Sequence, residues 1–211
     1  MKKFPLIIIF PIILSISRAD ETKSPDELYN EGIKKLSGGA FREDPDKAIE
    51  LFRKIMDLYP ESEYAVLAEI GIGDAYYKKK EYLSAVEVYK RFYEKKSDHE
   101  KVDYVLFRIG ECFYRLTPSP DRDLTPAQNG LLYLDILLKK YPLSPYREKA
   151  EKMAKVLKNK LSKRELIIGE FYLKRGDIGS AEKHFKMVLE MSEDDSLRKK
   201  AEKYLERIRE K

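Results

Sequence analysis

The sequence predicts an all-α protein built as a solenoid of about four helix-turn-helix repeats and closed by one C-terminal helix. From Pro25 onward, apolar residues recur with a helical period, and no segment shows the sustained alternation of a half-buried strand. One phrase occurs four times: a helix carrying a small residue, a turn, and a second helix with small and bulky residues four apart. With 37% charged residues, 10 Gly and 10 Pro in 211 residues, the composition is that of a helical protein with a charged surface.

The repeated phrase fits the tetratricopeptide pattern of about 34 residues, whose small positions 8 and 20 let two helices approach and whose position 24 is a bulky filler. The expected repeats and capping helix span about residues 25–60, 63–97, 102–142, 162–195 and 196–211. Position 8 is held by Gly32, Gly73, Gly110 and Gly169, and the bulky fillers are Phe52, Tyr89, Leu134 and Phe185. The third repeat carries an insertion, Leu116 to Ala127, and the charged stretch Tyr146 to Ser162 predicts an extended helix.

The first 19 residues are expected to be a signal peptide, which leaves residues 20–211 as the repeat domain. Two lysines precede a 13-residue apolar run, Phe4 to Ile16, and small residues place the cleavage after Ala19. This run is shorter than the roughly 20 residues that cross a bilayer as a helix. The alternative is that the segment is retained as an N-terminal anchor.

The residue counts exclude several classes of function. One cysteine (Cys112) and two histidines (His99 and His184) cannot build a cysteine-histidine metal cluster or a disulfide network, and no phosphate-binding glycine loop is present. We therefore expect no metal, no cofactor and no enzymatic activity. Lys and Glu alternate along the helices and the chain after Ala19 has a net charge of about +2, whereas a nucleic-acid binder gathers a basic excess on one face.

In such a solenoid, the first helix of each repeat lines the concave face, so pattern positions 2, 5, 9, 12 and 13 are expected to meet a ligand. The expected substrate-peptide residues are Tyr29, Ile33, Ile70, Asp74, Tyr77, Tyr104, Phe107, Glu111 and Tyr114, with Lys78 and Arg115 beside them. The third repeat is rich in aromatic residues, which suit an extended peptide with aromatic side chains. The alternative is that this stripe packs against a neighbouring helix or the inserted loop.

Several segments resemble the BamD family, which consists of periplasmic tetratricopeptide lipoproteins that act as outer-membrane assembly factors. The resemblance lies in the turn and helix 98–110, the inserted loop 119–123, the junction 141–146, and the segments 161–165 and 170–176. It covers roughly residues 25 to 192. Two features depart from the family: no cysteine lies near the expected cleavage site to carry a lipid, and the chain has one helix where members usually complete a fifth repeat.

The resemblance implies a non-catalytic subunit of the outer-membrane β-barrel assembly (BAM) complex at the inner face of the outer membrane. Its expected partners are the POTRA domains of a BamA-type barrel, other assembly subunits and unfolded outer-membrane proteins, with membrane contact only through these partners. The residues expected to bind the barrel subunit, from their place in the fourth repeat, are Arg164, Arg175, His184 and Lys186. The alternative function is a periplasmic adaptor of the Tol and cell-division type.

Overall fold

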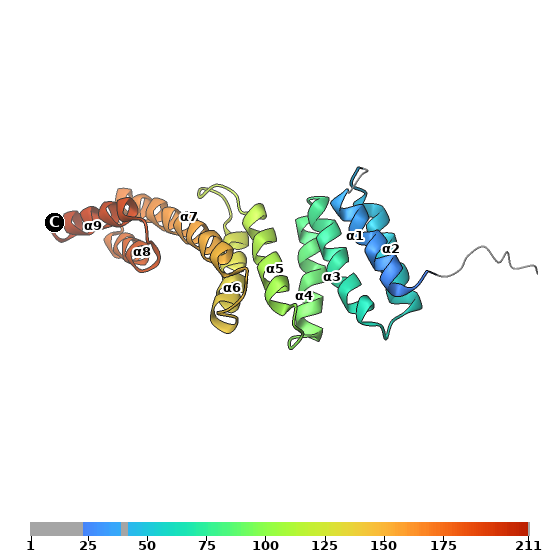
Figure 1. The fold of residues 1–211 in the computed structure, drawn as a ribbon. Coiled ribbons are helices and arrows are strands. Elements are labelled where there is room, and N and C mark those ends of the chain that lie inside the picture. Colours follow the sequence, from blue (N-terminus) through green and yellow to red (C-terminus); the bar gives the residue numbers. More distant parts are fainter. Residues whose placement is uncertain (1–22, 39–41, 211) are drawn as a thin grey trace, which may run out of the picture.

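The computed structural model describes residues 23–38 and 42–210, so the expected signal peptide, residues 1–19, lies outside the described part. Within that part the chain forms helices that follow one another in a single row, from α1 at one end to α9 at the other (Figure 1). Their bounds are α1 Pro25–Ser37, α2 Pro45–Leu58, α3 Glu63–Lys78, α4 Tyr82–Lys95, α5 Val102–Leu116, α6 Thr125–Lys140, α7 Arg147–Lys174, α8 Ile178–Met191 and α9 Asp195–Arg209. The predicted all-α solenoid is confirmed.

The helices pack in antiparallel pairs because a glycine of each first helix admits the bulky side chain of the second. A Cβ atom placed on Gly73 would lie 2.5 Å from Cε1 of Tyr89, a distance that real Cβ contacts do not reach. The same relation holds for four pairs: Gly32 with Phe52, Gly73 with Tyr89, Gly110 with Leu134, and Gly169 with Phe185. These are the residues of pattern positions 8 and 24, so the repeat geometry follows directly from the sequence pattern.

Three adjoining cores run along the row. One joins α1 to α4, the largest joins α3 to α7, and the third holds α7, α8 and α9 together. Tyr89, Phe52, Phe92 and Phe185 are among the largest fully buried side chains, and burying one such side chain contributes about 1.5–3 kcal/mol. The stability of the row therefore comes from contacts between neighbouring helices, as in other solenoids.

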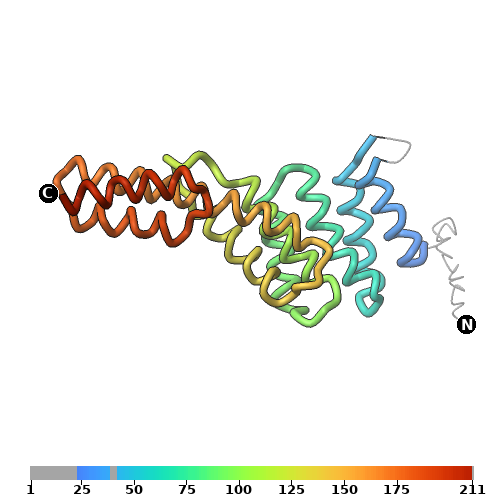
Figure 2. The backbone as a smooth tube through the Cα atoms, turned by 60° about the vertical axis from the view of Figure 1, so that its left-hand side comes forward, coloured from blue at the N-terminus to red at the C-terminus, as the bar shows by residue number. Residues whose placement is uncertain are grey.

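Helix α7 is 28 residues long and joins the N-terminal repeats to the C-terminal pair α8 and α9. The expected extended helix and the first helix of the expected fourth repeat form this single element, because no glycine or proline interrupts residues 147–168. The first half of α7 packs on α6 and its second half on α8. The three C-terminal helices consequently extend from the end of the N-terminal repeats (Figure 2).

The third repeat has a long loop between its two helices. Helix α5 ends at Leu116 and α6 begins at Thr125, so the loop comprises residues 117–124. The backbone amide and the hydroxyl of Thr125 both donate hydrogen bonds to Oδ1 of Asp123, at 3.0 and 2.8 Å. The N-cap residue of α6 is Leu124, which forms no side-chain cap, so the Asp123 carboxylate pairs only with the first helical residue, Thr125.

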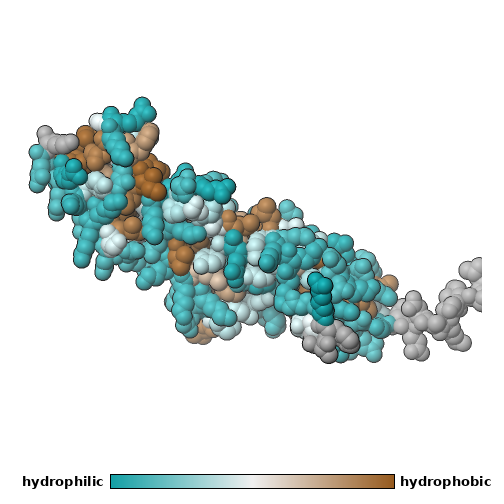
Figure 3. All heavy atoms as spheres, turned by 90° about the horizontal axis from the view of Figure 1, so that it is seen from above, coloured by the Kyte–Doolittle hydropathy of each residue, from teal (hydrophilic) through white to brown (hydrophobic). Residues whose placement is uncertain are grey.

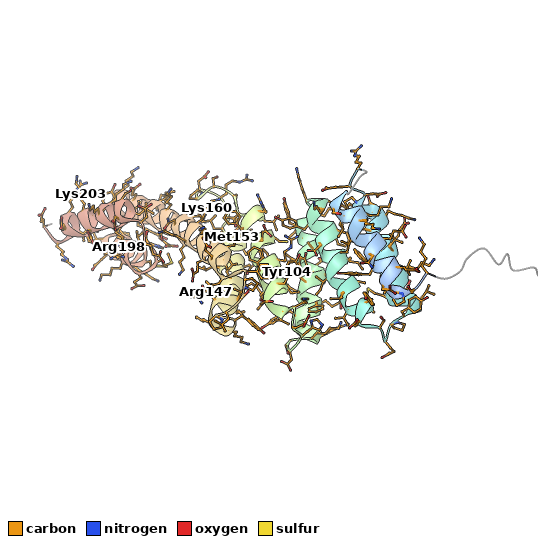
Figure 4. The ribbon with its side chains drawn as sticks, in the orientation of Figure 1. Tyr104, Arg147, Met153, Lys160, Arg198 and Lys203 are labelled. Atoms are coloured by element: carbon orange, nitrogen blue, oxygen red, sulfur yellow. The ribbon has the colours of Figure 1, made fainter. Side chains whose placement is uncertain are left out.

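The loop contacts α7 through its backbone carbonyl groups. Lys160 Nζ donates to the carbonyl oxygens of Thr117 and Pro118, at 3.1 and 3.0 Å. Arg164 donates to the carbonyl oxygen of Arg122. Lys160 lies on α7 beside the loop (Figure 4), so two cations of the long helix hold the inserted segment against it.

Helix α9 closes the C-terminal end. Asp194 caps it, since Oδ1 accepts hydrogen bonds from the amides of Ser196 and Leu197 at 2.9 and 3.3 Å. Leu197, Ala201 and Leu205 are buried in the third core, while the lysines and glutamates of α9 lie on its outer side. This is the arrangement expected of a capping helix.

Candidate pocket on the first-helix face

A small pocket lies where the first helices of the N-terminal repeats meet the start of α7. Its volume is about 250 Å³. The lining residues come from α1 (Tyr29), α3 (Leu67, Ile70 and Asp74), α5 (Tyr104), and the residues preceding α5 (Lys101) and α7 (Tyr146). We call this the tyrosine pocket. Tyr104 lies near the middle of the row (Figure 4), far from both of its ends.

Asp74 is the polar centre of the tyrosine pocket. Its Oδ1 accepts hydrogen bonds from the hydroxyls of Tyr89 and Tyr104, each at 2.6 Å, and lies 3.2 Å from Nε of Arg108. Burial, followed by the charge of the Asp74 carboxylate, raises the pKa of Tyr89 and of Tyr104. Both phenols therefore remain protonated donors at neutral pH.

Arg108 connects the Asp74 carboxylate to two other residues predicted to meet a ligand, Tyr77 and Glu111. Its guanidinium lies 3.7 Å from the centre of the Tyr77 ring and its NH1 lies 2.7 Å from Glu111. Arg115 Nε donates to the Tyr77 hydroxyl at 3.3 Å. Because a guanidinium over an aromatic face gains cation–π energy and here also pairs with two carboxylates, the network holds α3, α4 and α5 in register beneath the pocket.

The structure brings some of the predicted residues together and separates others. Tyr29, Asp74 and Tyr104 line the tyrosine pocket, and Tyr77 and Glu111 belong to the Arg108 network. Ile33 is 38% exposed outside the pocket, and Tyr114 packs partly buried against the central core.

Ile70 and Phe107 are only 6% and 5% exposed. Ile70 still lines the tyrosine pocket, whereas Phe107 is absent from its lining and requires a correction. The Phe107 ring stacks on Tyr146, with ring centres 5.0 Å apart and planes 18° apart. The aromatic stripe of the third repeat is thus divided: Phe107 packs against the start of α7, as the alternative interpretation held, while Tyr104 remains at the pocket.

Three lining residues were missed by the sequence analysis: Leu67, Lys101 and Tyr146. Leu67 stands at position 2 of the second repeat, since Gly73 is position 8, so the pattern itself could have found it. Lys101 lies in an inter-repeat turn. Tyr146 belongs to the junction before α7, and no repeat position predicts that it covers the first-helix face.

The four residues expected to bind a barrel subunit do not form one cluster. Arg164 donates to the α5–α6 loop, His184 Nδ1 lies 2.6 Å from Oε2 of Glu165, and Lys186 lies 2.7 Å from Oε1 of Glu182. Arg175 differs because it is exposed at the end of α7, with its guanidinium 5.4 Å from the centre of the Phe171 ring.

Arg175 lies beside one exposed apolar side chain, that of Phe171. Ile167 and Phe171 stand one turn apart on α7 and Ile178 begins α8, and these three side chains are 47%, 52% and 36% exposed. Seen from above, apolar residues also gather toward the C-terminal end of the molecule (Figure 3). We call these three side chains and Arg175 the C-terminal patch.

The described residues contain neither a metal-binding cluster nor a membrane span. No group of three or more His, Cys, Asp or Glu side chains in residues 23–38 and 42–210 is placed to hold a metal ion. In the same part of the chain, no helix is long and apolar enough to cross a bilayer. Cys112 is buried in α5, and burial raises the pKa of its thiol to about 12.

Comparison with known proteins gives a family for nearly the whole chain. The family model YfiO, described as outer membrane lipoprotein, matches residues 21–210. Curated relatives named outer membrane protein assembly factor BamD include that of Vibrio cholerae, with 29% identity over 72% of this chain and 65% of the relative. That of Caulobacter vibrioides has 25% identity over 83% of this chain and 56% of the relative. This chain therefore spans less than two thirds of the length of both relatives.

A solved structure supports the fold. The yeast Sti1 protein, described as a TPR2AB-domain:pHSP90 complex, superposes with a TM-score of 0.53 at 18% identity. The superposition covers 78% of this chain and 63% of that one. At this identity the similarity concerns the tetratricopeptide fold alone.

Proposed function

Since this chain belongs to the YfiO family of outer membrane lipoproteins, we propose that it is a non-catalytic subunit of the outer-membrane β-barrel assembly complex. The proposal places it in the periplasm at the inner face of the outer membrane. The observation that supports it, beyond family membership, is that the described residues leave two places open to a partner: the tyrosine pocket on the first-helix face and the exposed C-terminal patch. A scaffold that holds two partners needs two such surfaces on one rigid row of helices.

The proposed ligand of the tyrosine pocket is a segment of an unfolded outer-membrane protein. Strands of outer-membrane barrels alternate apolar and polar residues and carry aromatic girdles. The pocket offers aromatic rings from Tyr29, Tyr104 and Tyr146 with one carboxylate beside them. Aromatic side chains surrounded by polar partners are typical anchors of protein–protein contacts.

The proposed partner of the C-terminal patch is the POTRA region of a BamA-type barrel. Phe171 supplies an exposed aromatic anchor, and Arg175 over its ring supplies a charge. Aromatic and arginine side chains are enriched among the residues that dominate interface energies. Arg164, His184 and Lys186 stay proposed partner residues outside the C-terminal patch, since each is already paired within this chain.

Affinity capture tests this function. The full chain, tagged at its C-terminus, is used as bait for membrane extracts of the source organism, and proteins that remain after a salt wash are identified by mass spectrometry. The matched baits are Phe171→Ala with Arg175→Ala, and a control, Leu83→Ala, which changes a 62% exposed residue on α4.

We expect the unchanged chain and the control to retain the BamA-type barrel, and the double variant to retain at least about tenfold less, since interface hot spots cost 2 kcal/mol or more. Recovery of Tol-type or peptidoglycan-associated proteins without the barrel would contradict the proposal and favour the adaptor function. Equal recovery by all three baits would contradict the proposed site.

A further inference from the structure

The Asp74 carboxylate has an unused oxygen. Tyr89, Tyr104 and Arg108 all direct their hydrogen-bond or ion-pair contacts to Oδ1. Among the described residues no hydrogen bond or ion pair is made to Oδ2. An ionised carboxylate offers about four acceptor sites over its two oxygens, so Asp74 can accept a further donor in the tyrosine pocket, whose wall it forms.

The shape of the pocket limits what can bring that donor. Its volume of about 250 Å³ is below the roughly 300–1,000 Å³ of pockets that enclose a whole small molecule. Its walls are the rings of Tyr29, Tyr104 and Tyr146 and the aliphatic side chains of Leu67 and Ile70. These walls suit one flat, largely apolar side chain, because aromatic rings gain energy from offset or edge contacts with one another.

The charges around the pocket exclude a charged side chain. A basic side chain would meet Lys101 at the pocket and Arg108 behind Asp74, and Arg108 already pairs with this carboxylate. An acidic side chain would meet the Asp74 carboxylate itself. A neutral ring with a terminal donor avoids both repulsions, and the phenols of Tyr89 and Tyr104 already pair with the same carboxylate at 2.6 Å.

We infer that the tyrosine pocket is a subsite for one tyrosine side chain of a bound segment, whose hydroxyl donates a hydrogen bond to Oδ2 of Asp74. The inference rests on the proposed function, since it names the side chain that the pocket selects in an outer-membrane protein. It distinguishes tyrosine from phenylalanine, which would fill the walls and leave the carboxylate oxygen without a partner.

The test uses labelled peptides of about ten residues, the length of a barrel strand, that differ at one position. That position is tyrosine, O-methyltyrosine, phenylalanine, arginine or glutamate, and each peptide is titrated with the full chain while its fluorescence anisotropy is measured. The tyrosine peptide should bind about tenfold more tightly than the phenylalanine peptide, which is the effect of one hydrogen bond to a charged group. The O-methyltyrosine peptide should lose the same factor, because it keeps the ring and the oxygen but not the donor.

Two variants of the chain locate the effect. Leu67→Trp should fill the pocket and remove the preference for tyrosine, because Leu67 lines it. Leu83→Trp, on an exposed part of α4, should keep the preference, and circular dichroism checks that both variants are folded.

The outcomes separate this inference from the proposed function. Equal affinity for the tyrosine and phenylalanine peptides, with binding still weakened by Leu67→Trp, would overturn the tyrosine subsite and leave the substrate role standing. Absence of binding by all peptides would overturn both. If the arginine or glutamate peptide bound more tightly than the tyrosine peptide, the pocket would not select a neutral side chain and the tyrosine subsite would be overturned.

Discussion

Replacement of Gly73 by alanine adds a single methyl group but should markedly lower the free energy of unfolding. The added Cβ would lie 2.5 and 2.7 Å from Cε1 and Cζ of Tyr89, whereas carbon atoms in contact sit about 3.5–4.0 Å apart. The Tyr89 ring must therefore move by roughly 1 Å, and its side chain is fully buried. Such overpacking costs about 1–3 kcal/mol.

The same movement affects the tyrosine pocket. Tyr89 donates to Asp74 at 2.6 Å, and weakening a hydrogen bond to a charged group costs about 1.5–3 kcal/mol. The higher helix propensity of alanine offsets about 1 kcal/mol of this loss. We therefore expect Gly73→Ala to lower the free energy of unfolding by about 2 kcal/mol or more, which lowers Tm by about 4–8 °C for a chain of this size.

The assay is urea unfolding followed by circular dichroism at 222 nm. The matched control is Gly179→Ala, because the nearest side-chain atom to a Cβ there lies 4.0 Å away. That variant should be more stable by about 0.4–1 kcal/mol, since alanine restricts the unfolded chain. If Gly73→Ala unfolds at the same urea concentration as the unchanged chain, the close packing of the two helices does not set their stability and the reasoning is wrong.

Three further predictions concern other parts of the molecule. Replacing both Lys160 and Arg164 by alanine should broaden the distribution of distances between spin labels on α1 and α9, because their hydrogen bonds hold the inserted loop against α7. Lys163→Ala is the control. An unchanged distribution would show that the loop does not fix the position of α7. Burial opposes ionisation of Glu69, but hydrogen bonds from two cations at 2.7 and 3.1 Å lower its pKa below the ordinary 4.5. This lowered pKa stabilises the fold above pH 4.5, and the contribution is lost as pH falls through the folded-state value. Glu69→Gln should thus cost about 1.5–3 kcal/mol at pH 7 and less in acid, and a cost that urea unfolding finds equal at pH 7 and pH 3 would refute this. The Cys112 thiol should not react with Ellman's reagent at pH 8 until urea unfolds the chain, since burial raises its pKa to about 12; rapid reaction of the folded protein would contradict the buried position.

The fold could be predicted because the contacts that make it are local. Gly73 and Tyr89 stand 16 residues apart and meet within one helical pair; the same spacing recurs for Gly169 and Phe185, so a periodic sequence encodes the packing directly. The joining of the charged stretch to the last repeat was harder to foresee. A helix that changes its buried face along α7 keeps no single apolar stripe for a sequence pattern to reveal.

The candidate site could be predicted only in part. Tyr29 and Asp74 stand at expected ligand positions and do line the tyrosine pocket. Phe107 stands at an equivalent position but is covered by Tyr146, which comes from a junction outside the repeats. Asp74 also draws its partners from 15 and 30 residues away, and a repeat pattern states which residues face the groove but not which of them pair.

Photo-crosslinking in living cells shows whether unfolded outer-membrane proteins enter the tyrosine pocket. A photoreactive phenylalanine derivative replaces Leu67 in the tyrosine pocket or, as the control, the exposed Leu83 on α4, and the crosslinked proteins are identified by mass spectrometry. We expect newly made outer-membrane proteins to be crosslinked from position 67 and not from position 83. If position 67 gives no crosslinks to outer-membrane proteins, or if both positions give them equally strongly, the pocket does not bind these proteins.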